Sequence, residues 1–415
     1  MRSLIRCVPR VGALGADSKV WTTPRSGRTP RMLAALLVAL SCSGITDPRS
    51  SEPPGFVAIA PAGSATCALA ATGEVFCWGA GIALGNGTGR QQLRPGRVHA
   101  DVDFAQLTMR GLTCFGCAAP EHACALTAGG TAYCWGSNAD GQLGDGTTTH
   151  RLAPVRVVGE HNFTSIVAGG RHSCALDRSG VVYCWGGMGA GDLGSQSRNA
   201  RTVPTPVRDA PAFSAIVAGE NHTCGLAAGQ AHCWGTNESG QLGTGSTARH
   251  ARPRPVSGEF LFTSLAAGGQ SVCGVTTDRA TVCWGSTYDS RPYTGPTTRA
   301  TPTPIDVGVN FVSLALGWTH ACGLDDAGAA FCWGDNELGL WGGDRLGNGT
   351  TEGRPAPERV VGGLVFRTLA AGEGHTCGIT LTGGAYCWGD NRSGQLGIGS
   401  VDQGRTVQMA ISASR

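Results

Sequence analysis

The stretch His172-Ser-Cys174-Ala-Leu-Asp-Arg-Ser-Gly-Val-Val-Tyr-Cys184-Trp-Gly186 decides the fold, because versions of it recur seven times along the chain. The tripeptide Cys-Trp-Gly marks each copy, and successive copies are spaced by 57, 50, 49, 50, 49 and 55 residues. A period near fifty residues, built from short segments bounded by Gly, Asp and Pro, is typical of a β-propeller. We therefore predict an all-β fold, a seven-bladed propeller of four-stranded antiparallel blades over residues 56–411. Residues 407–411 would supply the outer strand of the seventh blade, so each repeat would form one blade.

A second Cys precedes each Cys-Trp-Gly tripeptide, ten residues earlier in six units and nine residues earlier in the fourth. In a tight hairpin, Cys174 faces Cys184 across a three-residue loop, and Cys224 faces Cys233 across the two-residue loop Ala228-Gly229. Opposed strand residues have Cβ atoms about 4.5–5.5 Å apart, which suits a disulfide. We predict one cross-strand disulfide per blade: Cys67–Cys77, Cys124–Cys134, Cys174–Cys184, Cys224–Cys233, Cys273–Cys283, Cys322–Cys332 and Cys377–Cys387.

Small residues accompany the Trp of each repeat. The residue after the first Cys is Ala or Gly in all seven units, as in Ala175 and Gly225. Strand alternation places it on the face that carries the Trp, so we expect it to make room for the indole. Seven of the ten Trp are therefore predicted to be core residues.

The other cysteines and the histidines bear on metal binding. Cys114 and Cys117 are predicted to form a local disulfide, since a redox motif would need a helix N-terminus to lower the thiol pKa. The repeats lack Cys pairs at zinc-ligand spacing, and histidines spaced one per blade would lie far apart. We expect structural histidines, no metal and no cofactor. The recurrent histidines are His122, His172, His222, His320 and His375, replaced by Ala65 and Ser271 in two units.

The N-terminus has the pattern of an export signal. Residues 32–41 form an apolar run after several Arg residues, too short to span a bilayer and typical of a signal-peptide core. The run ends at Ala39-Leu-Ser-Cys42, which resembles a bacterial lipoprotein cleavage box, so Cys42 is the predicted lipid anchor. Ordinary signal-peptidase cleavage and a later true start codon stay open. We predict a leader over 1–41, a flexible tether over 42–55, and a cell-envelope (periplasm-facing or outer surface) or secreted location.

The charge of the chain depends on this leader. The formal net charge is +3, but residues 1–41 hold seven of the 32 basic residues and one of the 29 acidic ones. The remainder carries 25 basic and 28 acidic residues, a net charge of −3, which disfavours nucleic acid as a partner. Lys19 is the one Lys of the chain, so P-loop phosphate binding and Schiff-base chemistry are excluded from the propeller.

Loops after the Trp identify a family. The sequence resembles the regulator of chromosome condensation repeat family of seven-bladed propellers in Trp135-Gly-Ser-Asn-Ala-Asp-Gly-Gln-Leu-Gly-Asp-Gly146, in Trp388-Gly-Asp-Asn-Arg-Ser-Gly-Gln-Leu-Gly-Ile-Gly399 and in Ala-Gly-x-x-His at Ala168–His172. The paired Cys depart from the eukaryotic pattern. The founding member exchanges nucleotide on a small GTPase and binds chromatin through a basic tail, which this chain lacks. Secreted bacterial members include a β-lactamase inhibitor, so the resemblance favours a rigid propeller that binds a protein.

Insertions in the repeats indicate a binding surface. Phe104 to His122 spans eighteen residues, against nine from Phe163 to His172, and the sixth unit has five extra residues after Trp333. Both insertions join strands on the same face of a propeller, where repeat proteins usually bind, and aromatic and Arg side chains make binding hot spots. Loop drift with partly buried aromatics is the alternative. The predicted partner-binding residues are Arg110, Phe115, Tyr288, Tyr293, Trp318, Leu340 and Trp341.

These observations favour a non-catalytic module that binds an unidentified protein or glycan, with no nucleic acid and no membrane contact beyond the lipid anchor. A monomer is expected. No nucleophile elbow or phosphate-binding loop precedes a helix, so an enzyme is not predicted. The alternatives are nucleotide exchange as in the eukaryotic relatives and a propeller enzyme with an unrecognised site. A cluster of polar groups in the central channel would favour the enzyme.

Overall fold

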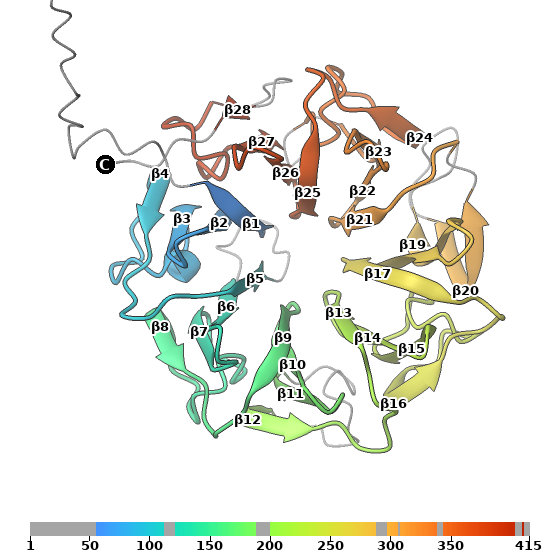
Figure 1. Ribbon diagram of the computed structural model, residues 1–415, viewed down its shortest axis with the longest axis horizontal. Helices are drawn as coiled ribbons and strands as arrows, with labels where there is room; N and C mark the ends of the chain where they lie inside the picture. Colours follow the sequence, from blue (N-terminus) through green and yellow to red (C-terminus); the bar gives the residue numbers. More distant parts are fainter. Residues whose placement is uncertain are drawn as a thin grey trace, which may run out of the picture. The chain divides into compact units, whose positions relative to one another are not determined.

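The computed structural model describes residues 55–111, 121–187, 200–287, 297–305, 308–337, 343–402 and 409–410 of the 415-residue chain. These residues form seven four-stranded antiparallel sheets, arranged as blades around a central axis (Figure 1). The strands of each blade follow one another along the chain, so each repeat forms one blade. The predicted fold class is confirmed. The leader, Cys42 and the tether up to residue 54 lie outside the described residues.

Each blade begins at the central axis and ends at the periphery (Figure 1). In the described part of the chain the one helical segment is the 3₁₀ turn η1, and no helix there could span a membrane. Blade by blade, the elements are β1 (Phe56–Pro61), β2 (Ala65–Ala70), β3 (Val75–Gly79), η1 (Ile82–Leu84) and β4 (Gln92–Arg97); β5 (Gln106–Arg110), β6 (His122–Leu126), β7 (Ala132–Gly136) and β8 (Arg151–Arg156); β9 (Phe163–Ala168), β10 (His172–Asp177), β11 (Val182–Gly186) and β12 (Arg201–Pro206); β13 (Ala215–Ala218), β14 (His222–Ala227), β15 (Gln230–Gly235) and β16 (His250–Pro255); β17 (Phe262–Gly268), β18 (Ser271–Thr276), β19 (Thr281–Thr287) and β20 (Thr297–Ile305); β21 (Ser313–Leu316), β22 (His320–Leu324), β23 (Ala330–Gly334) and β24 (Arg354–Arg359); β25 (Phe366–Ala371), β26 (His375–Thr380), β27 (Ala385–Gly389) and β28 (Met409–Ala410).

The seventh blade is completed by the C-terminal end of the chain. In it, β28 pairs with β27, with Met409 opposite Cys387. The prediction of an outer strand within 407–411 is thus confirmed for its two described residues. Among the described strands none is exchanged between the first and last blades. The two blades meet through hydrogen bonds: the Phe56 N–H donates to the Gly383 carbonyl at 3.0 Å, and the Arg367 guanidinium donates to the Phe56 carbonyl at 2.9 Å.

All seven predicted blade disulfides are present. The second and third strands place the two Cys of each blade directly opposite one another, with Cα atoms 4.0–4.1 Å apart. The half-cystines are buried, none more than 4% exposed. The register of the hairpin therefore creates these bonds, as the sequence spacing indicated. The pair Cys114 and Cys117 lies outside the described residues.

The fourth blade accommodates its shorter Cys spacing in the turn. Ala227 pairs with Gln230, which leaves the two-residue loop predicted from the sequence. Both loop residues have positive φ, 50° at Ala228 and 80° at Gly229, and two positive φ values define the type I′ turn that suits a two-residue hairpin. The Cys224–Cys233 register is thereby kept with one residue fewer.

The small residue after the first Cys makes room for a different ring from the one expected. A Cβ on Gly225 would lie 2.5 Å from Cδ1 of Phe213, the Phe that precedes the first strand of that blade. The Phe213 ring in turn lies 5.8 Å from the Trp234 ring. The prediction that the small residue makes room for the indole is therefore wrong in its nearest contact, which is the Phe ring. The seven Trp are core residues as predicted, none more than 4% exposed.

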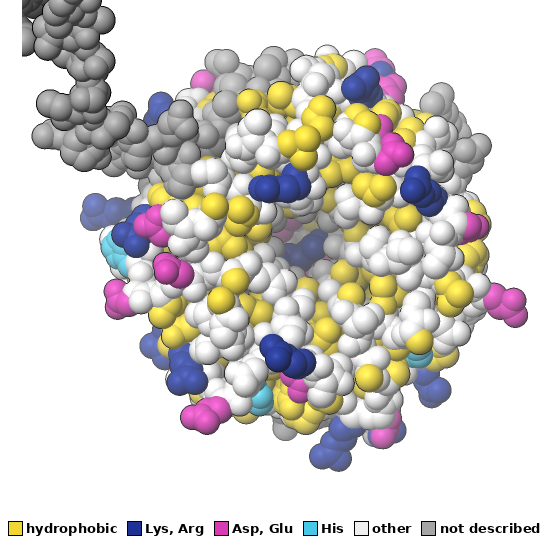
Figure 2. Space-filling model, viewed as in Figure 1, with side chains coloured by type: hydrophobic (Ala, Val, Ile, Leu, Met, Phe, Trp, Pro, Cys, Tyr) yellow, Lys and Arg dark blue, Asp and Glu magenta, His cyan; other side chains and the backbone are white. Residues whose placement is uncertain are grey.

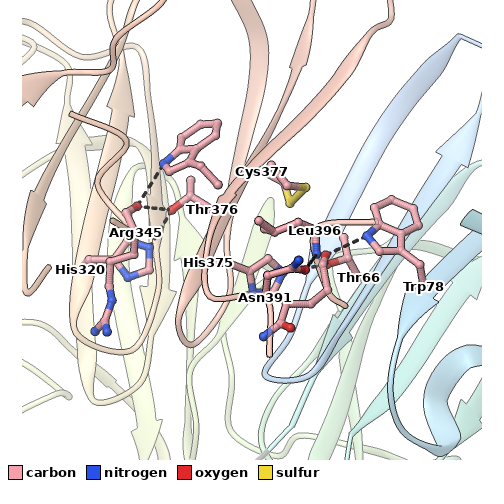
Figure 3. The surroundings of a disulfide bond; sticks show 12 residues. Thr66, Trp78, His320, Arg345, His375, Thr376, Cys377, Asn391 and Leu396 are labelled. Carbon is pink, nitrogen blue, oxygen red and sulfur yellow. Dashed lines mark hydrogen bonds between the residues drawn. A yellow bond between two sulfur atoms is a disulfide. The ribbon is translucent and has the colours of Figure 1, made fainter. Parts of the chain in front are cut away.

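Adjacent blades are joined by a repeated contact between a His and a hydroxyl group. The Nε2 atom of His320 in blade six lies 2.8 Å from the Thr376 hydroxyl in blade seven (Figure 3). That hydroxyl donates to the Arg345 carbonyl at 2.9 Å, which also accepts from the Trp388 indole N–H at 3.1 Å. Because the single hydroxyl proton goes to the carbonyl, the imidazole carries its proton on Nε2 and donates it. We call this arrangement the His–hydroxyl contact.

The His–hydroxyl contact confirms the structural role predicted for the repeated histidines, with one exception. His222 has no hydrogen-bond partner on either ring nitrogen, since the corresponding residue of blade five is Val272. Where the His itself is missing, as at Ala65 and Ser271, the next blade also lacks the hydroxyl and carries Ala123 or Ala321. The His–hydroxyl pairs are His375–Thr66, His122–Ser173, His172–Thr223 and His320–Thr376.

The outer strands protect the exposed edges of the blades. Pro residues, which cannot donate a ladder hydrogen bond, recur in these strands beside exposed Arg side chains, as in the run Arg252-Pro-Arg254-Pro of β16. Charged side chains and Pro on an edge strand prevent pairing with another chain. The periphery of the propeller is therefore built to stay unpaired.

Candidate functional site

The connections of the propeller divide into two faces. Links between the first and second strands, and between the third and fourth, emerge on one face, which we call the loop face. The segment after Arg110 joins β5 to β6, the segment after Thr287 joins β19 to β20, and the segment after Glu337 joins β23 to β24. The predicted binding residues in these segments (Phe115, Tyr288, Tyr293, Leu340 and Trp341) lie outside the described residues.

Trp318 stands on the loop face between β21 and β22. Its side chain is half-buried and lies over the turn of blade five, where a Cβ on Gly269 would approach the indole Cδ1 to 2.9 Å. Trp318 also borders a cavity of about 30 Å³ between blades five and six, next to Ser271 and Ala321, where the His–hydroxyl contact is missing. That volume matches one water molecule, so the cavity itself does not make a ligand site.

Arg110, one of the predicted partner-binding residues, is the last residue of β5, at the loop face. It pairs with His122, and its side chain enters the central channel. There Nη1 donates to the Ala267 carbonyl of blade five at 3.1 Å and to the Ala218 carbonyl of blade four at 3.5 Å. The guanidinium thus crosses the channel, because ring closure brings the ends of the inner strands together.

Three Glu residues that were not predicted from the sequence lie on the loop face, where Glu373 and Glu220 interact electrostatically with Arg110 and Glu121 with Glu373. Burial raises the pKa of Glu121 to about 7, against hydrogen bonds from Ser64. Burial and the Glu121 carboxylate raise the pKa of Glu373 to about 8. Burial also raises the pKa of Glu220, although Arg110 opposes that shift. These Glu residues precede the His position of their repeats by one or two places, and comparison of those places across repeats could have found them.

Glu121 has a structural partner in the neighbouring blade. The backbone N–H and the hydroxyl of Ser64 both donate to its Oε1 atom, the hydroxyl at 3.1 Å. Ser64 lies beside Ala65, where blade one lacks the repeated His, so this contact replaces the missing His–hydroxyl contact between blades one and two. Oε2 of Glu121 and Oε1 of Glu373 are buried without a hydrogen-bond partner. Within the described residues no group of three or more His, Cys, Asp or Glu could hold a metal ion.

The inner strands form the wall of the channel. Its volume is about 280 Å³, and Figure 2 shows it as a hollow at the centre of the ring with basic and acidic side chains inside. Arg110 is the charged residue among its described lining residues. The surface that these residues expose to the channel is more polar than apolar, whereas small-molecule sites are usually mainly apolar. The aliphatic residues of the lining include Met109, Val167, Val217, Leu265, Leu314 and Leu369.

Two family models match segments of this chain. The family model described as the Regulator of chromosome condensation (RCC1) repeat matches residues 129–176, 179–226 and 228–275. A second model of the same description matches residues 163–191, 311–339 and 366–395. The matched segments fall in blades two to seven, and those over residues 163–191, 311–339 and 366–395 each contain both paired Cys of their blade.

Curated relatives match over short segments. The chain is 34% identical over 77 residues to the ultraviolet-B receptor UVR8 of Arabidopsis thaliana, covering 17% of this chain and 18% of the receptor. It is 40% identical over 75 residues to the human RCC1 domain-containing protein 1, covering 16% of this chain and 20% of that protein. The matches therefore span about a fifth of each relative.

Solved structures share the fold over most of the chain. Human WBSCR16 superposes with a TM-score of 0.69 at 20% identity, covering 79% of this chain and 87% of that one. Yeast RCC1 (Prp20), solved bound to Kap60, gives a TM-score of 0.69 at 19% identity, covering 93% and 92%. The ectodomain of the Physcomitrella patens receptor kinase CR4 gives 0.53 at 24% identity, covering 80% and 73%.

Proposed function

The chain is a seven-bladed propeller of the RCC1 repeat family, and we propose that it is a non-catalytic module that binds a protein or glycan partner outside the cytosol. The proposal assigns binding to the loop face. The observation that carries it is the concentration of departures from the repeat on that face. The turns between second and third strands, on the opposite face, stay short in all seven blades.

The rigidity of the propeller suits a binding role. Seven disulfides and four His–hydroxyl contacts fix the blades, so a loop-face surface would be held in place before a partner arrives. A preorganised surface loses little conformational entropy on binding. The half-buried indole of Trp318 offers the kind of aromatic group that dominates binding energies. Tyr288, Tyr293, Leu340 and Trp341 belong to the same proposal by their place in the chain.

An oxidising compartment is part of this proposal. Cytosolic reductants keep thiols reduced, whereas disulfides persist in exported proteins. Seven buried cross-strand pairs therefore support export, and Cys42 would serve as the lipid anchor of a cell-envelope protein. The likeness of fold to a receptor ectodomain gives a precedent for such a propeller outside the cytosol.

An enzyme that uses the channel is the second candidate. Glu121 and Glu373 have pKa values raised to about 7 and 8, and such shifts are typical of acid–base groups as well as of buried structural ones. The binding role is preferred because Glu121 is held by Ser64 and Arg110 by two carbonyls. Both groups already have structural partners.

The test compares variants on the two faces. Trp318→Ala, Tyr293→Ala and Trp341→Ala change the loop face, and Leu381→Ala is the control, since Leu381 is 65% exposed on the turn between β26 and β27. The oxidised protein and each variant are used to capture partners from envelope extracts, with thermal unfolding as a check of folding. We expect the loop-face variants to lose the captured species and Leu381→Ala to retain it. Equal capture by all variants would refute the assignment.

A further inference from the structure

We propose that the outer rim of the propeller binds an anionic polysaccharide, one that carries sulfate or carboxylate groups along its length. The rim is the band formed by the described outer strands β4, β8, β12, β16, β20 and β24. It is separate from the loop face and from the channel, so the inference does not depend on the function proposed for the loop face. Three observations on the rim support it.

The first observation is the sign of the charges on these strands. The six outer strands hold ten Arg residues and one acidic residue, Glu358. The chain beyond residue 41 carries 25 basic and 28 acidic residues in all, so positive charge is concentrated on the rim. Protection of an edge strand needs charged side chains, but charges of either sign serve it. The excess of one sign therefore needs a further reason, and a negatively charged partner supplies it.

The second observation is that Arg recurs at one register position of the outer strands. The residue opposite the Gly of Cys-Trp-Gly is Arg in four of the six blades, and His250 and Gln92 take its place in the other two. Because the ring repeats this position from blade to blade, the side chains form a row along the rim. Figure 2 shows basic side chains around the outer edge of the ring. The four Arg residues are Arg151, Arg201, Arg299 and Arg354.

The rim is continuous from one blade to the next. The Gly87 N–H, in the segment between β3 and β4, donates to the Leu152 carbonyl of β8 at 2.9 Å. The Gly146 N–H, between β7 and β8, donates to the Thr202 carbonyl of β12 at 2.9 Å. The loop of each of these blades thus lies against the next outer strand, and a linear polymer would follow the row of Arg without crossing a gap.

The third observation is that several rim cations are free to bind. Arg94, Arg156, Arg254 and Arg359 lie on four different outer strands, are exposed, and take no part in the ion pairs of the described residues. A guanidinium presents several N–H donors in one plane, which matches the oxygens of a sulfate or carboxylate. Arg-rich segments of this kind are typical of surfaces that bind anionic polymers.

The rim favours a polysaccharide over a nucleic acid. The six described outer strands contain no Phe, Tyr or Trp. Proteins that bind single-stranded nucleic acid use such rings to stack the bases. A sulfated or uronic-acid polysaccharide needs only the cations, because its negative groups lie along the outside of the polymer.

The experiment measures binding of two anionic polysaccharides, dextran sulfate and polygalacturonate, to the disulfide-bonded protein by calorimetry near pH 7 at low salt. Neutral dextran and a single-stranded DNA oligonucleotide are the comparison polymers. The rim variant combines Arg94→Gln, Arg156→Gln and Arg254→Gln. Thermal unfolding confirms that each protein is folded.

The matched control combines Arg171→Gln, Arg178→Gln and Arg279→Gln. These three Arg are exposed as well, but they lie on the two faces of the propeller, before β10 and in the turns after β10 and β18. The control variant therefore loses the same net charge as the rim variant. All proteins carry the same leader, so its basic residues contribute equally to every measurement.

We expect one or both anionic polysaccharides to bind the wild type, with an affinity that falls as salt is added, and neutral dextran not to bind. The rim variant should bind about tenfold more weakly or worse, because charged hydrogen-bonding groups are lost. The control variant should stay within about threefold of the wild type, since exposed charges away from the site are screened.

Three results would overturn the proposal. The first is that neither anionic polysaccharide binds at low salt. The second is an equal loss of binding in the rim and control variants, which would mean that net charge alone decides it. The third is tighter binding of the DNA oligonucleotide than of both polysaccharides, which would assign the rim to nucleic acid.

Discussion

The imidazole Nε2 of His375 lies 2.7 Å from the hydroxyl oxygen of Thr66, 309 residues earlier in the chain. This contact joins the last blade to the first, and it uses the same groups that join blades three and four through His172 and Thr223. Figure 3 shows it beside the equivalent contact of His320. Ring closure therefore needs no special device, because the two ends of the chain carry the two halves of a repeated interface.

Replacing Thr66 by Val should weaken this closure. The variant keeps the shape of the side chain but leaves the buried His375 Nε2–H without its acceptor, and it removes a donor from the Gln395 carbonyl. An unsatisfied buried polar group costs about 1–3 kcal/mol. We expect the free energy of unfolding, measured by urea denaturation of the oxidised protein, to fall by that amount. Thr72→Val, at an exposed hydroxyl bonded to Glu74, is the control, and an equal loss in both variants would contradict the role of the closure contact.

Replacing Val272 by Thr should supply the missing partner of His222. Val272 occupies the place of Thr66, Ser173, Thr223 and Thr376 in the other contacts, and Thr has nearly the same shape. The new hydroxyl would accept from His222 and donate to the Gln241 carbonyl, which already accepts from the Trp284 indole at 3.0 Å. We expect a gain of about 1 kcal/mol in the free energy of unfolding.

The control for this gain is Val275→Thr on the same strand. Val275 is buried among apolar side chains of blades five and six, so a hydroxyl there gains no His and should reduce stability. If the free energy of unfolding rose in Val275→Thr, or fell in Val272→Thr, the hydroxyl would not be acting through His222. The comparison separates formation of the contact from any general effect of Thr in β18.

The blade disulfides could be predicted from sequence because hairpin register depends on residue counts. A separation of ten residues, or of nine with the turn at Ala228-Gly229, fixes which Cys faces which. The unpartnered His222 could also have been found there, since Val272 breaks the pattern of hydroxyls. The Cys pairing and the missing hydroxyl opposite His222 both depend on residue spacing within a repeat, and the strand register keeps that spacing.

The channel groups could not be predicted in the same way. Arg110 contacts Ala218 and Ala267, which are 108 and 157 residues away, and only the closed ring brings these strand ends together. The small residue at Gly225 was assigned to the wrong ring, because alternation gives the face of a side chain and not its nearest neighbour. Long-range packing decides both cases.

The fourteen blade Cys should resist alkylation. Each pair is buried and disulfide-bonded, so iodoacetamide should modify none of them in the native protein or after unfolding without a reductant, as read by mass spectrometry. A mild reductant added to the native protein should not reduce these disulfides, because thiolate attack needs access to a sulfur atom. Reaction of several blade Cys before reduction would show free thiols and remove the support for export. Unfolding in reductant, followed by alkylation, is the positive control.

Stability should depend on pH in two opposed ways. Burial lowers the pKa of His375 to about 4 and that of His122 to about 3. Between those values and the ordinary His pKa of about 6.5, the unfolded chain binds protons that the folded chain does not. The His contribution to stability is therefore lost as pH falls below about 6.5. Above that pH the histidines are neutral in both the folded and the unfolded state. The buried carboxyl groups, whose pKa values are raised, then dominate the pH dependence of stability.

Glu373 tests the alkaline side. Its pKa is raised to about 8 by burial and by Glu121, with Glu220 and Asp390 acting in the same direction and Arg110 against it. The folded state holds a proton that the unfolded state has released, so stability should fall as pH rises from about 6.5 to 8, by at most about 1.4 kcal/mol per pH unit for this group. Glu373→Gln cannot ionise and should reduce that slope, measured by urea denaturation across the range. The exposed Glu259→Gln is the charge-matched control, and an unchanged slope in Glu373→Gln would show that Glu373 is already ionised in the folded protein.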